Sequence, residues 1–270
     1  SLGLVGSEMC IRDRLKSMKK IVVAPDSFKG SLTSAEVADA VERGIKDVFP
    51  QCNVVKAGVA DGGEGTVEAI VKAVGGDMYA ASVTDPLGRP VKAAYGIVRS
   101  GGVKTAVMEM SAASGLPLLL PDELNPWITS TYGTGEMISD ALNRGCRKFL
   151  VGIGGSATND AGTGMLSALG VRFLDSRGQR LKGCGRDLES IARIDMSSLM
   201  PAARESEFIV ACDVNTPFCG PDGAARVFAP QKGADPQTAE ALDRGMRSFA
   251  RVIAGQFQTC LLYTSDAADD

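Results

Sequence analysis

The sequence contains no histidine among its 270 residues. Imidazole is the most frequent general base in enzymes and a common metal ligand, so its absence excludes Ser-His hydrolysis and histidine-ligated metal sites. The groups that remain for chemistry are carboxylates, lysines, hydroxyls and backbone donors. Carboxylates without histidine suit Mg²⁺, a hard ion that prefers oxygen ligands and shares them with phosphates.

Other features that are absent narrow the class of protein. The seven cysteines include no CxxC pair, which favours reduced cytosolic thiols over a disulfide framework or a zinc site. No apolar run approaches the length that crosses a bilayer. The net charge of -3 argues against a nucleic-acid or membrane surface. We therefore expect a cytoplasmic protein that acts on a small molecule, with no nucleic acid and no membrane as partner.

Length and composition indicate a globular protein with room for one large or two ordinary domains, since 44% of its residues are hydrophobic and 23% are charged. The two ends are out of character with the rest. Residues 1–17 and 258–270 have no clear periodicity and no capping signal, and both resemble translated sequencing-adapter sequence. We expect these segments to be non-native tails on a piece of a longer protein.

The most informative stretch is glycine-rich and extends from Gly152 to Met165. It follows a predicted buried strand over 148–151 and precedes a predicted helix start. Glycine allows close approach of a ligand, and the amides at a helix N-terminus attract anions. We predict an anion-binding loop; the alternative is a glycine-rich turn that only packs closely. Its candidate residues are Gly154, Gly155, Ser156, Thr158, Asn159, Gly162 and Gly164.

The order of predicted elements indicates an α/β fold. Residues 20–25 and 53–59 are predicted strands, and each is followed by a glycine-containing turn and a helical pattern, the first capped by Thr33 or Ser34. This order is typical of a parallel α/β sheet. Short alternating segments over 77–107 predict antiparallel strands, where a second domain begins. Residues 208–213 predict another buried strand.

Acidic residues follow several predicted strands. Asp26 and Asp61 each lie just past the end of one, Asp213 lies at the carboxyl end of another, and Asp160 lies in the glycine-rich stretch. In open α/β sheets ligands bind outside the carboxyl ends of the strands, so these side chains are candidates for one acidic site. The alternative is that each aspartate only caps the following turn.

Two lysines are candidates for binding a phosphate or a carboxylate, with a solvated lysine as the alternative. Lys29 lies in a turn with Ser27, Gly30 and Ser31, and Lys232 is a weaker case of the same kind. The chain has neither GxxxxGKS nor GxxxxGKT, so it is no P-loop NTPase. It also lacks a dinucleotide-binding GxGxxG pattern.

Several stretches together resemble the bacterial glycerate kinase family, type I. They are APDSFKGSLTSAEVADAVERG (24–44), VADGGEGTVEAI (59–70), DPLGRPVKAAYG (85–96), MEMSAASGLPLL (108–119), NPWITSTYGTGEMISDAL (125–142), GIGGSATNDAGTGMLSALGVRFLD (152–175) and ACDVNTPFCGPDGAARVFAPQKGA (211–234).

The resemblance implies two α/β domains. The first is Rossmann-like and is built from both ends of the chain, so residues 18–76 form its first half and it is incomplete here. The second is inserted as residues 77–257. Family members continue beyond this C-terminus and complete the first domain there.

The resemblance also implies a kinase that transfers the γ-phosphoryl group of ATP, with Mg²⁺, to a hydroxyl of D-glycerate, commonly giving 2-phosphoglycerate. The predicted catalytic residues are Asp26, Lys29, Asp160 and Asp213, with Asp160 or Asp26 as the base, and the predicted metal ligands are Asp61 and Asp213. The predicted substrate and phosphate ligands are Ser27, Gly30, Ser31, Gly62, Gly63, Gly154, Gly155, Ser156, Thr158, Asn159, Gly162, Gly164 and Lys232.

Two alternatives stay open at this point. The first is a different enzyme built on the same loops, either a kinase for another small hydroxy acid or a phosphatase. The second is an inactive fragment that only binds nucleotide or anions. A homodimer is also left open.

Overall fold

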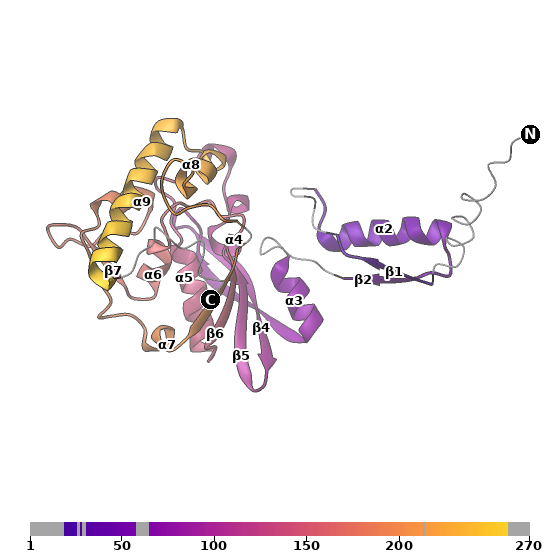
Figure 1. Ribbon diagram of the computed structural model, residues 1–270. Coiled ribbons are helices and arrows are strands. Elements are labelled where there is room, and N and C mark those ends of the chain that lie inside the picture. Colours follow the sequence, from indigo (N-terminus) through magenta and orange to yellow (C-terminus); the bar gives the residue numbers. More distant parts are fainter. Residues whose placement is uncertain (1–18, 26–27, 29–30, 58–64, 213, 259–270) are drawn as a thin grey trace, which may run out of the picture. The chain divides into compact units, whose positions relative to one another are not determined.

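The computed structural model describes residues 19–25, 28, 31–57, 65–212 and 214–258. Their contacts define two units, one up to Ala60 and one from Asp61, and each has its own sheet. Both units combine strands with helices (Figure 1), which confirms the predicted α/β class. The Rossmann-like character of the first domain and the domain boundaries at 76 and 257 stay predictions.

The first unit is a strand–helix–strand motif. Strands β1 (Lys20–Val23) and β2 (Asn53–Lys56) pair in parallel and are joined through helix α2 (Ser34–Val48). The helix begins with a capping box, in which Thr33 Oγ1 accepts from the Glu36 amide and the Glu36 carboxylate accepts from the Thr33 amide at 2.8 Å. This confirms Thr33, of the two candidates, as the helix cap.

The strands of this unit are less buried than the sequence predicts. Val22 in β1 is 59% exposed, because the sheet has only two strands and α2 is the helix that contacts it within the described part of the unit. Strand β2 ends at Lys56, and residues 58 and 59 of the predicted strand lie outside the described residues.

The second unit is organised around a five-stranded mixed sheet in the order β3-β4-β5-β6-β9. Strands β3 (Gly76–Thr84), β4 (Pro90–Ser100) and β5 (Val103–Glu109) are antiparallel, as predicted for 77–107. Strands β6 (Lys148–Gly152) and β9 (Glu207–Ala211) continue the sheet in parallel with β5. The carboxyl ends of β5, β6 and β9 therefore lie along one edge of the sheet.

Helices cover both faces of this sheet (Figure 1). Helix α3 (Thr66–Val74) packs on one face, where a Cβ on Gly96 of β4 would lie 2.2 Å from Val71 Cγ2. Helix α5 (Tyr132–Asn143) packs on the opposite face, because neighbouring strand residues alternate between the two cores. The larger core on the α5 side includes Ala93, Tyr95, Ile97, Ala106, Met108, Phe149 and Val151.

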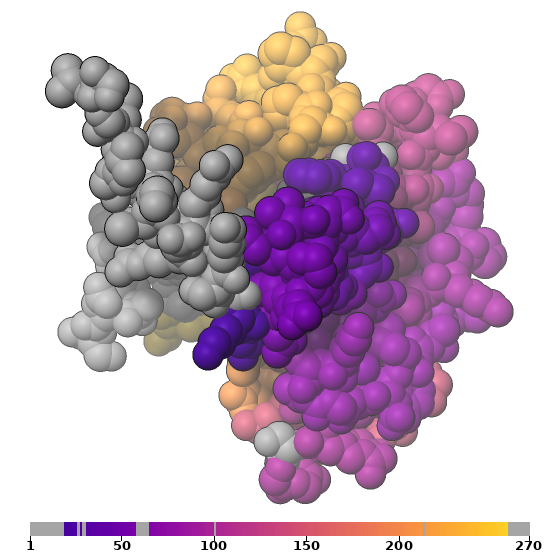
Figure 2. Space-filling model, turned by 90° about the vertical axis from the view of Figure 1, so that its right-hand side faces the viewer, coloured from indigo at the N-terminus to yellow at the C-terminus, as the bar shows by residue number. Residues whose placement is uncertain are grey.

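A second apolar cluster lies around the C-terminal helix α9 (Pro236–Phe257), which Asp235 caps by accepting from the Thr238 amide at 2.7 Å. The antiparallel strands β7 (Arg172–Leu174) and β8 (Arg193–Asp195) belong to this cluster. Helix α9 lies at the end of the unit opposite the β4–β5 turn (Figures 1 and 2). No helix in the described part of the chain is both long and apolar enough to cross a bilayer.

The remaining elements of the second unit are short. They are the helices α4 (Ser111–Ser114), α6 (Thr163–Ala168), α7 (Pro201–Arg204) and α8 (Ala224–Phe228), and the 3₁₀ helices η1 (Leu116–Leu118), η2 (Pro121–Glu123), η3 (Gly185–Ser190) and η4 (Pro230–Lys232).

Strand β9 corrects the prediction of a buried strand over 208–213. Ile209 is 52% exposed and its neighbours Phe208 and Val210 are also exposed, although Phe208 stacks on Phe149 with ring centroids 4.6 Å apart. The reason is its place in the sheet: within the described residues, β9 pairs on one side only, with β6. The sequence pattern of an interior strand gives no information about which strand lies at the edge.

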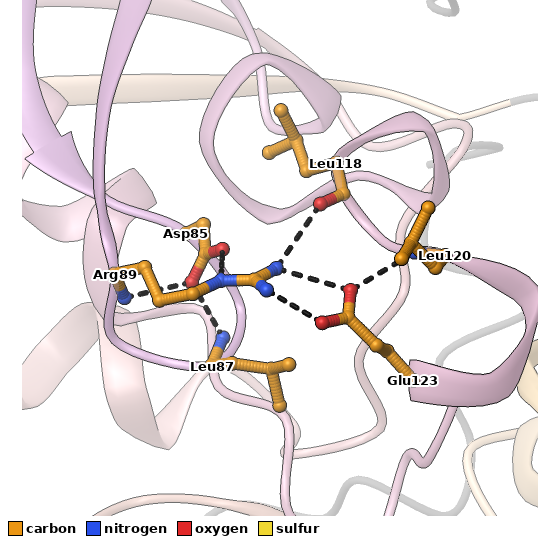
Figure 3. A network of polar contacts seen from close by, with 6 residues as sticks. All are labelled: Asp85, Leu87, Arg89, Leu118, Leu120 and Glu123. Atoms are coloured by element: carbon orange, nitrogen blue, oxygen red, sulfur yellow. Dashed lines mark hydrogen bonds and ion pairs between the residues drawn. The ribbon is translucent and has the colours of Figure 1, made fainter.

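An arginine connects the β3–β4 turn to the segment around η2 (Figure 3). Arg89 Nε lies 2.5 Å from Asp85 Oδ2, and its Nη1 lies 2.6 Å from Glu123 Oε1. Arg89 Nη2 also donates to the Leu118 carbonyl at 3.3 Å. The Arg89 guanidinium and the Leu120 amide hold the pKa of Glu123 below its ordinary value. The network joins the β3–β4 turn to the η1–η2 segment.

A pair of glycine substitutions tests the packing of α5 on α6. A Cβ at Gly135 would lie 2.2 Å from the Met165 carbonyl oxygen, whereas a Cβ at Gly255 meets nothing within 4 Å. We expect Gly135→Ala to lower the free energy of unfolding by about 2–3 kcal/mol, since the backbone must shift. Gly255→Ala should raise it by about 0.5–1 kcal/mol, because alanine favours an exposed helix interior. Urea unfolding measures both, and equal effects would contradict the close approach.

Candidate functional site

The glycine loop, residues 152–164, leaves β6 at the edge where the parallel strands end. It is joined to the segment 110–116 that follows β5 by three backbone hydrogen bonds of 2.9 Å, which involve Gly152, Gly155 and Ala157. Thr129 Oγ1 donates to the Ala157 carbonyl at 2.8 Å. The loop is thus held against the neighbouring segments along its first half.

A buried carboxylate holds the second half of the loop. Asp160 is 1% exposed and accepts hydrogen bonds from Thr131, through its amide and its hydroxyl at 2.8 Å each, and from the amides of Gly162 and Gly164 at 3.1 and 3.2 Å. Burial raises the pKa of Asp160, while these hydrogen bonds act in the opposite direction. Because Thr131 directly precedes α5 and Gly162 caps α6, one carboxylate joins the starts of two helices.

The amides at the start of α6 are therefore occupied by protein groups. Besides the two amides bound to Asp160, the Met165 amide donates to Thr131 Oγ1 at 2.9 Å. None of these three amides is free to bind a phosphate. An anion site in this loop is therefore restricted to the first half of the loop, and the start of α6 is excluded.

Glycine is required in the loop for two different reasons. At Gly164 a Cβ would lie 2.1 Å from Ser130 Oγ and 2.8 Å from the Tyr132 amide nitrogen, so close packing excludes any side chain. Gly155 instead has a φ of +70° and lies in an exposed turn. No hydrogen bond from the Gly154 or Gly155 amide to another described residue is present. The packing alternative thus accounts for Gly164, whereas the exposed turn has two amides with no acceptor among the described residues.

Lys232 reaches the loop from η4. Its ammonium nitrogen donates to Ser156 Oγ at 2.7 Å and to the Thr158 carbonyl at 2.6 Å, and the residue is only 7% exposed. Burial lowers the pKa of Lys232 to about 8, and the charge of Asp160 acts in the opposite direction. A buried ammonium must be hydrogen-bonded to be tolerated, and the loop supplies those acceptors.

The structure brings together nine of the predicted site residues, namely Gly154, Gly155, Ser156, Thr158, Asn159, Asp160, Gly162, Gly164 and Lys232. Of these, Thr158 and Asn159 are buried, and the Asn159 side chain contacts Met246 Sδ at 3.3 Å. Ser31 is exposed in the first unit. The other predicted site residues lie outside the described residues, namely Asp26, Ser27, Lys29, Gly30, Asp61, Gly62, Gly63 and Asp213.

Sequence reasoning missed Thr131 and Glu109. Thr131 bonds both Asp160 and Met165, and Glu109 ends β5 and accepts from the Val67 amide at the start of α3 at 2.9 Å. The signal for Glu109 was the one used for Asp61 and Asp213, an acidic residue at or just past the end of a strand. For Thr131 it was a run of hydroxyl residues before a helix.

The predicted Mg²⁺ ligands, Asp61 and Asp213, both lie outside the described residues. Within the described ranges no three Cys, Asp or Glu side chains lie close enough to hold a metal ion. Asp160 does not fit the role of a ligand, because its oxygens already accept four hydrogen bonds from the protein.

A mixed sheet with a glycine-rich loop at the carboxyl edge of its parallel strands defines an α/β protein, a class in which ligands bind at this edge. Comparison with known proteins is more specific. Residues 21–268 match the model of the glycerate kinase family. This chain belongs to the glycerate kinase family.

Curated relatives agree with this membership. The chain is 50% identical over 233 residues to the glycerate kinase of Haemophilus influenzae, which covers 86% of this chain and 61% of that protein. It is 47% identical over 234 residues to the glycerate 2-kinase of Escherichia coli K12, which covers 87% of this chain and 61% of that protein. The chain thus spans about 60% of the length of these relatives.

A solved structure shares the fold. The crystal structure of a Salmonella typhimurium LT2 protein assigned as glycerate kinase 2 superposes with a TM-score of 0.78 at 45% identity, covering 90% of this chain and 65% of that one.

Substitution of Asp160 tests whether its carboxylate holds the loop. In Asp160→Asn one oxygen becomes an amide group that faces backbone N–H donors, so we expect a loss of about 2–4 kcal/mol in the free energy of unfolding. The matched control is Asp175→Asn, where a turn carboxylate accepts the amides of Arg177 and Gln179 in an exposed setting and the cost should stay at about 0.5–1 kcal/mol. Equal losses in a denaturant titration would contradict the role of burial.

The pKa of Lys232 predicts a pH dependence of stability. The unfolded lysine keeps its proton up to its ordinary pKa of 10.5, whereas the folded one releases it near 8. The unfolded state therefore holds more protons between these values, and the contribution of this lysine to stability rises with pH across that window, by up to about 3 kcal/mol. Lys232→Met should remove this rise, and the exposed Lys182→Met should retain it. Parallel stability profiles for wild type and Lys232→Met would contradict the lowered pKa.

Proposed function

We propose that this chain is part of an ATP-dependent kinase that phosphorylates a hydroxyl of D-glycerate to give 2-phosphoglycerate. The observation that carries the proposal is its membership of the glycerate kinase family. The choice of the 2-hydroxyl rests on the relative named glycerate 2-kinase. Because the chain spans about 60% of the relatives, the activity belongs to the whole protein.

In this proposal the phosphates of ATP bind at the exposed turn of the glycine loop, around Gly154 and Gly155, whose amides have no partner among the described residues. Lys29, predicted from the sequence, adds a positive charge. The turn follows β6 at the carboxyl edge of the sheet, which is where ligands of open α/β sheets bind.

Of the two candidates for the general base, we assign this role to Asp26 and not to Asp160. The Asp160 carboxylate is buried and bonded to four protein donors, so it is poorly placed to accept the proton of a substrate hydroxyl. Asp26 follows β1, and its side chain lies outside the described residues. Asp61 and Asp213 remain the proposed ligands of Mg²⁺, which would neutralise phosphate charge when bound.

The reaction itself needs alignment more than covalent help from the protein. The hydroxyl oxygen of glycerate forms a bond to the γ-phosphorus while the bond to the β,γ-bridging oxygen breaks. The hydroxyl proton passes to the aspartate base, and ADP leaves. The glycine loop contributes by fixing the position of the phosphates during phosphoryl transfer.

A coupled assay of ADP release with D-glycerate, ATP and Mg²⁺ tests the proposal. It should be run on this chain and on a version extended with the remaining sequence of the Haemophilus influenzae relative. We expect ADP release that depends on glycerate in the extended protein, and a fall of at least a hundredfold in kcat for its Asp213→Asn variant, the order expected when one charge-stabilising group is lost.

The extended protein also distinguishes the alternatives. Release of ADP with another hydroxy acid but not with glycerate would overturn glycerate as the substrate and would support the kinase activity. A folded extended protein that binds nucleotide without releasing ADP would overturn the kinase proposal.

A further inference from the structure

We infer that Lys232 is a positioning residue of the phosphate site. Its ammonium group fixes the conformation of the glycine loop in which the turn at Gly154 and Gly155 binds phosphate, and it does not contact the phosphate itself. The inference rests on the proposed function only for the identity of the anion. The holding of the loop by Lys232 rests on its contacts alone.

The contacts of Lys232 are directed at both ends of one short segment. The ammonium donates to Ser156 Oγ and to the Thr158 carbonyl, which lie on the two sides of Ala157. The Ala157 amide and carbonyl are themselves bound, to the Ser114 carbonyl and to Thr129 Oγ1. The segment 156–158 is thus held from several sides, and Lys232 supplies its charged contact.

Burial separates Lys232 from the solvent-facing turn. Lys232 and Thr158 are both buried, whereas Gly155 is exposed and Ser156 is half-buried. A ligand that enters from solvent meets the turn at Gly154 and Gly155 before it meets the ammonium. Ser156 lies between the two, since its hydroxyl accepts from Lys232 and its backbone belongs to the turn.

The alternative, a lysine that binds phosphate directly, makes a different prediction in a double-mutant cycle. If Lys232 acts through Ser156 and Thr158, removing the Ser156 hydroxyl removes part of the same effect, and the two losses do not add. If Lys232 contacts the phosphate itself, the losses are independent and multiply.

The experiment measures the affinity of this chain for inorganic pyrophosphate by calorimetry at pH 7. The variants are Lys232→Met, Ser156→Ala, the double variant, and Lys182→Met as a control for the lost charge, since Lys182 is exposed and has no ion pair among the described residues. We expect at least a tenfold weaker Kd for Lys232→Met and about threefold for Ser156→Ala, and for the double variant the Kd of Lys232→Met alone. Lys182→Met should bind within twofold of wild type.

A Kd in the double variant equal to the product of the two single losses would overturn the inference and make Lys232 a direct ligand. Wild-type affinity in Lys232→Met would overturn it as well.

A hydrogen-exchange measurement without ligand tests the role of Lys232 independently of the proposed function. We expect exchange of the Ala157 amide, which donates to the Ser114 carbonyl, to become at least fivefold faster in Lys232→Met and faster in Ser156→Ala, with β3 to β5 unchanged. If wild type binds no pyrophosphate, the phosphate site of the proposed function fails, and this exchange alone decides the role of Lys232. If Lys232→Met does not fold, Ser156→Ala decides, and unchanged exchange there overturns the inference.

Discussion

The buried carboxylate of Asp160 is the interaction on which the candidate site depends. A charge removed from water is costly unless donors surround it, and here four hydrogen bonds from Thr131, Gly162 and Gly164 do so. These donors belong to the starts of α5 and α6, so both helices are oriented by one side chain. The close approach at Gly164, where no Cβ fits, follows from the same arrangement.

A second buried charge, of opposite sign, completes the loop. The Lys232 ammonium donates to Ser156 and Thr158 in the first half of the loop, whereas the Asp160 carboxylate holds the second half. Because folding already fixes the loop, a ligand at its exposed turn would bind without the entropic cost of ordering it. The turn at Gly154 and Gly155 differs from the rest of the loop, since its amides donate no hydrogen bond to another described residue.

The sequence could predict what depends on local pattern. It predicted a helix cap at Thr33 or Ser34, the antiparallel strands over 77–107, and the glycine loop between β6 and α6. It could not predict that the loop directs Asp160 and Thr158 inwards, because a loop of glycine, hydroxyl and acidic residues has the same composition whether its polar groups face a ligand or the protein. The burial of Lys232 and the exposure of β9 depend on tertiary neighbours distant in the chain.

The separation of these residues along the chain has a consequence for synthesis. The segment 110–116, Thr129 and Thr131 all precede the loop, so their bonds to it can form as soon as it leaves the ribosome. Lys232 comes 76 residues after Ser156. At a synthesis rate of about 5–20 residues per second, Lys232 is added to the chain roughly 4–15 s after Ser156. During that interval the loop has its bonds to the earlier segments and lacks the two hydrogen bonds from the Lys232 ammonium.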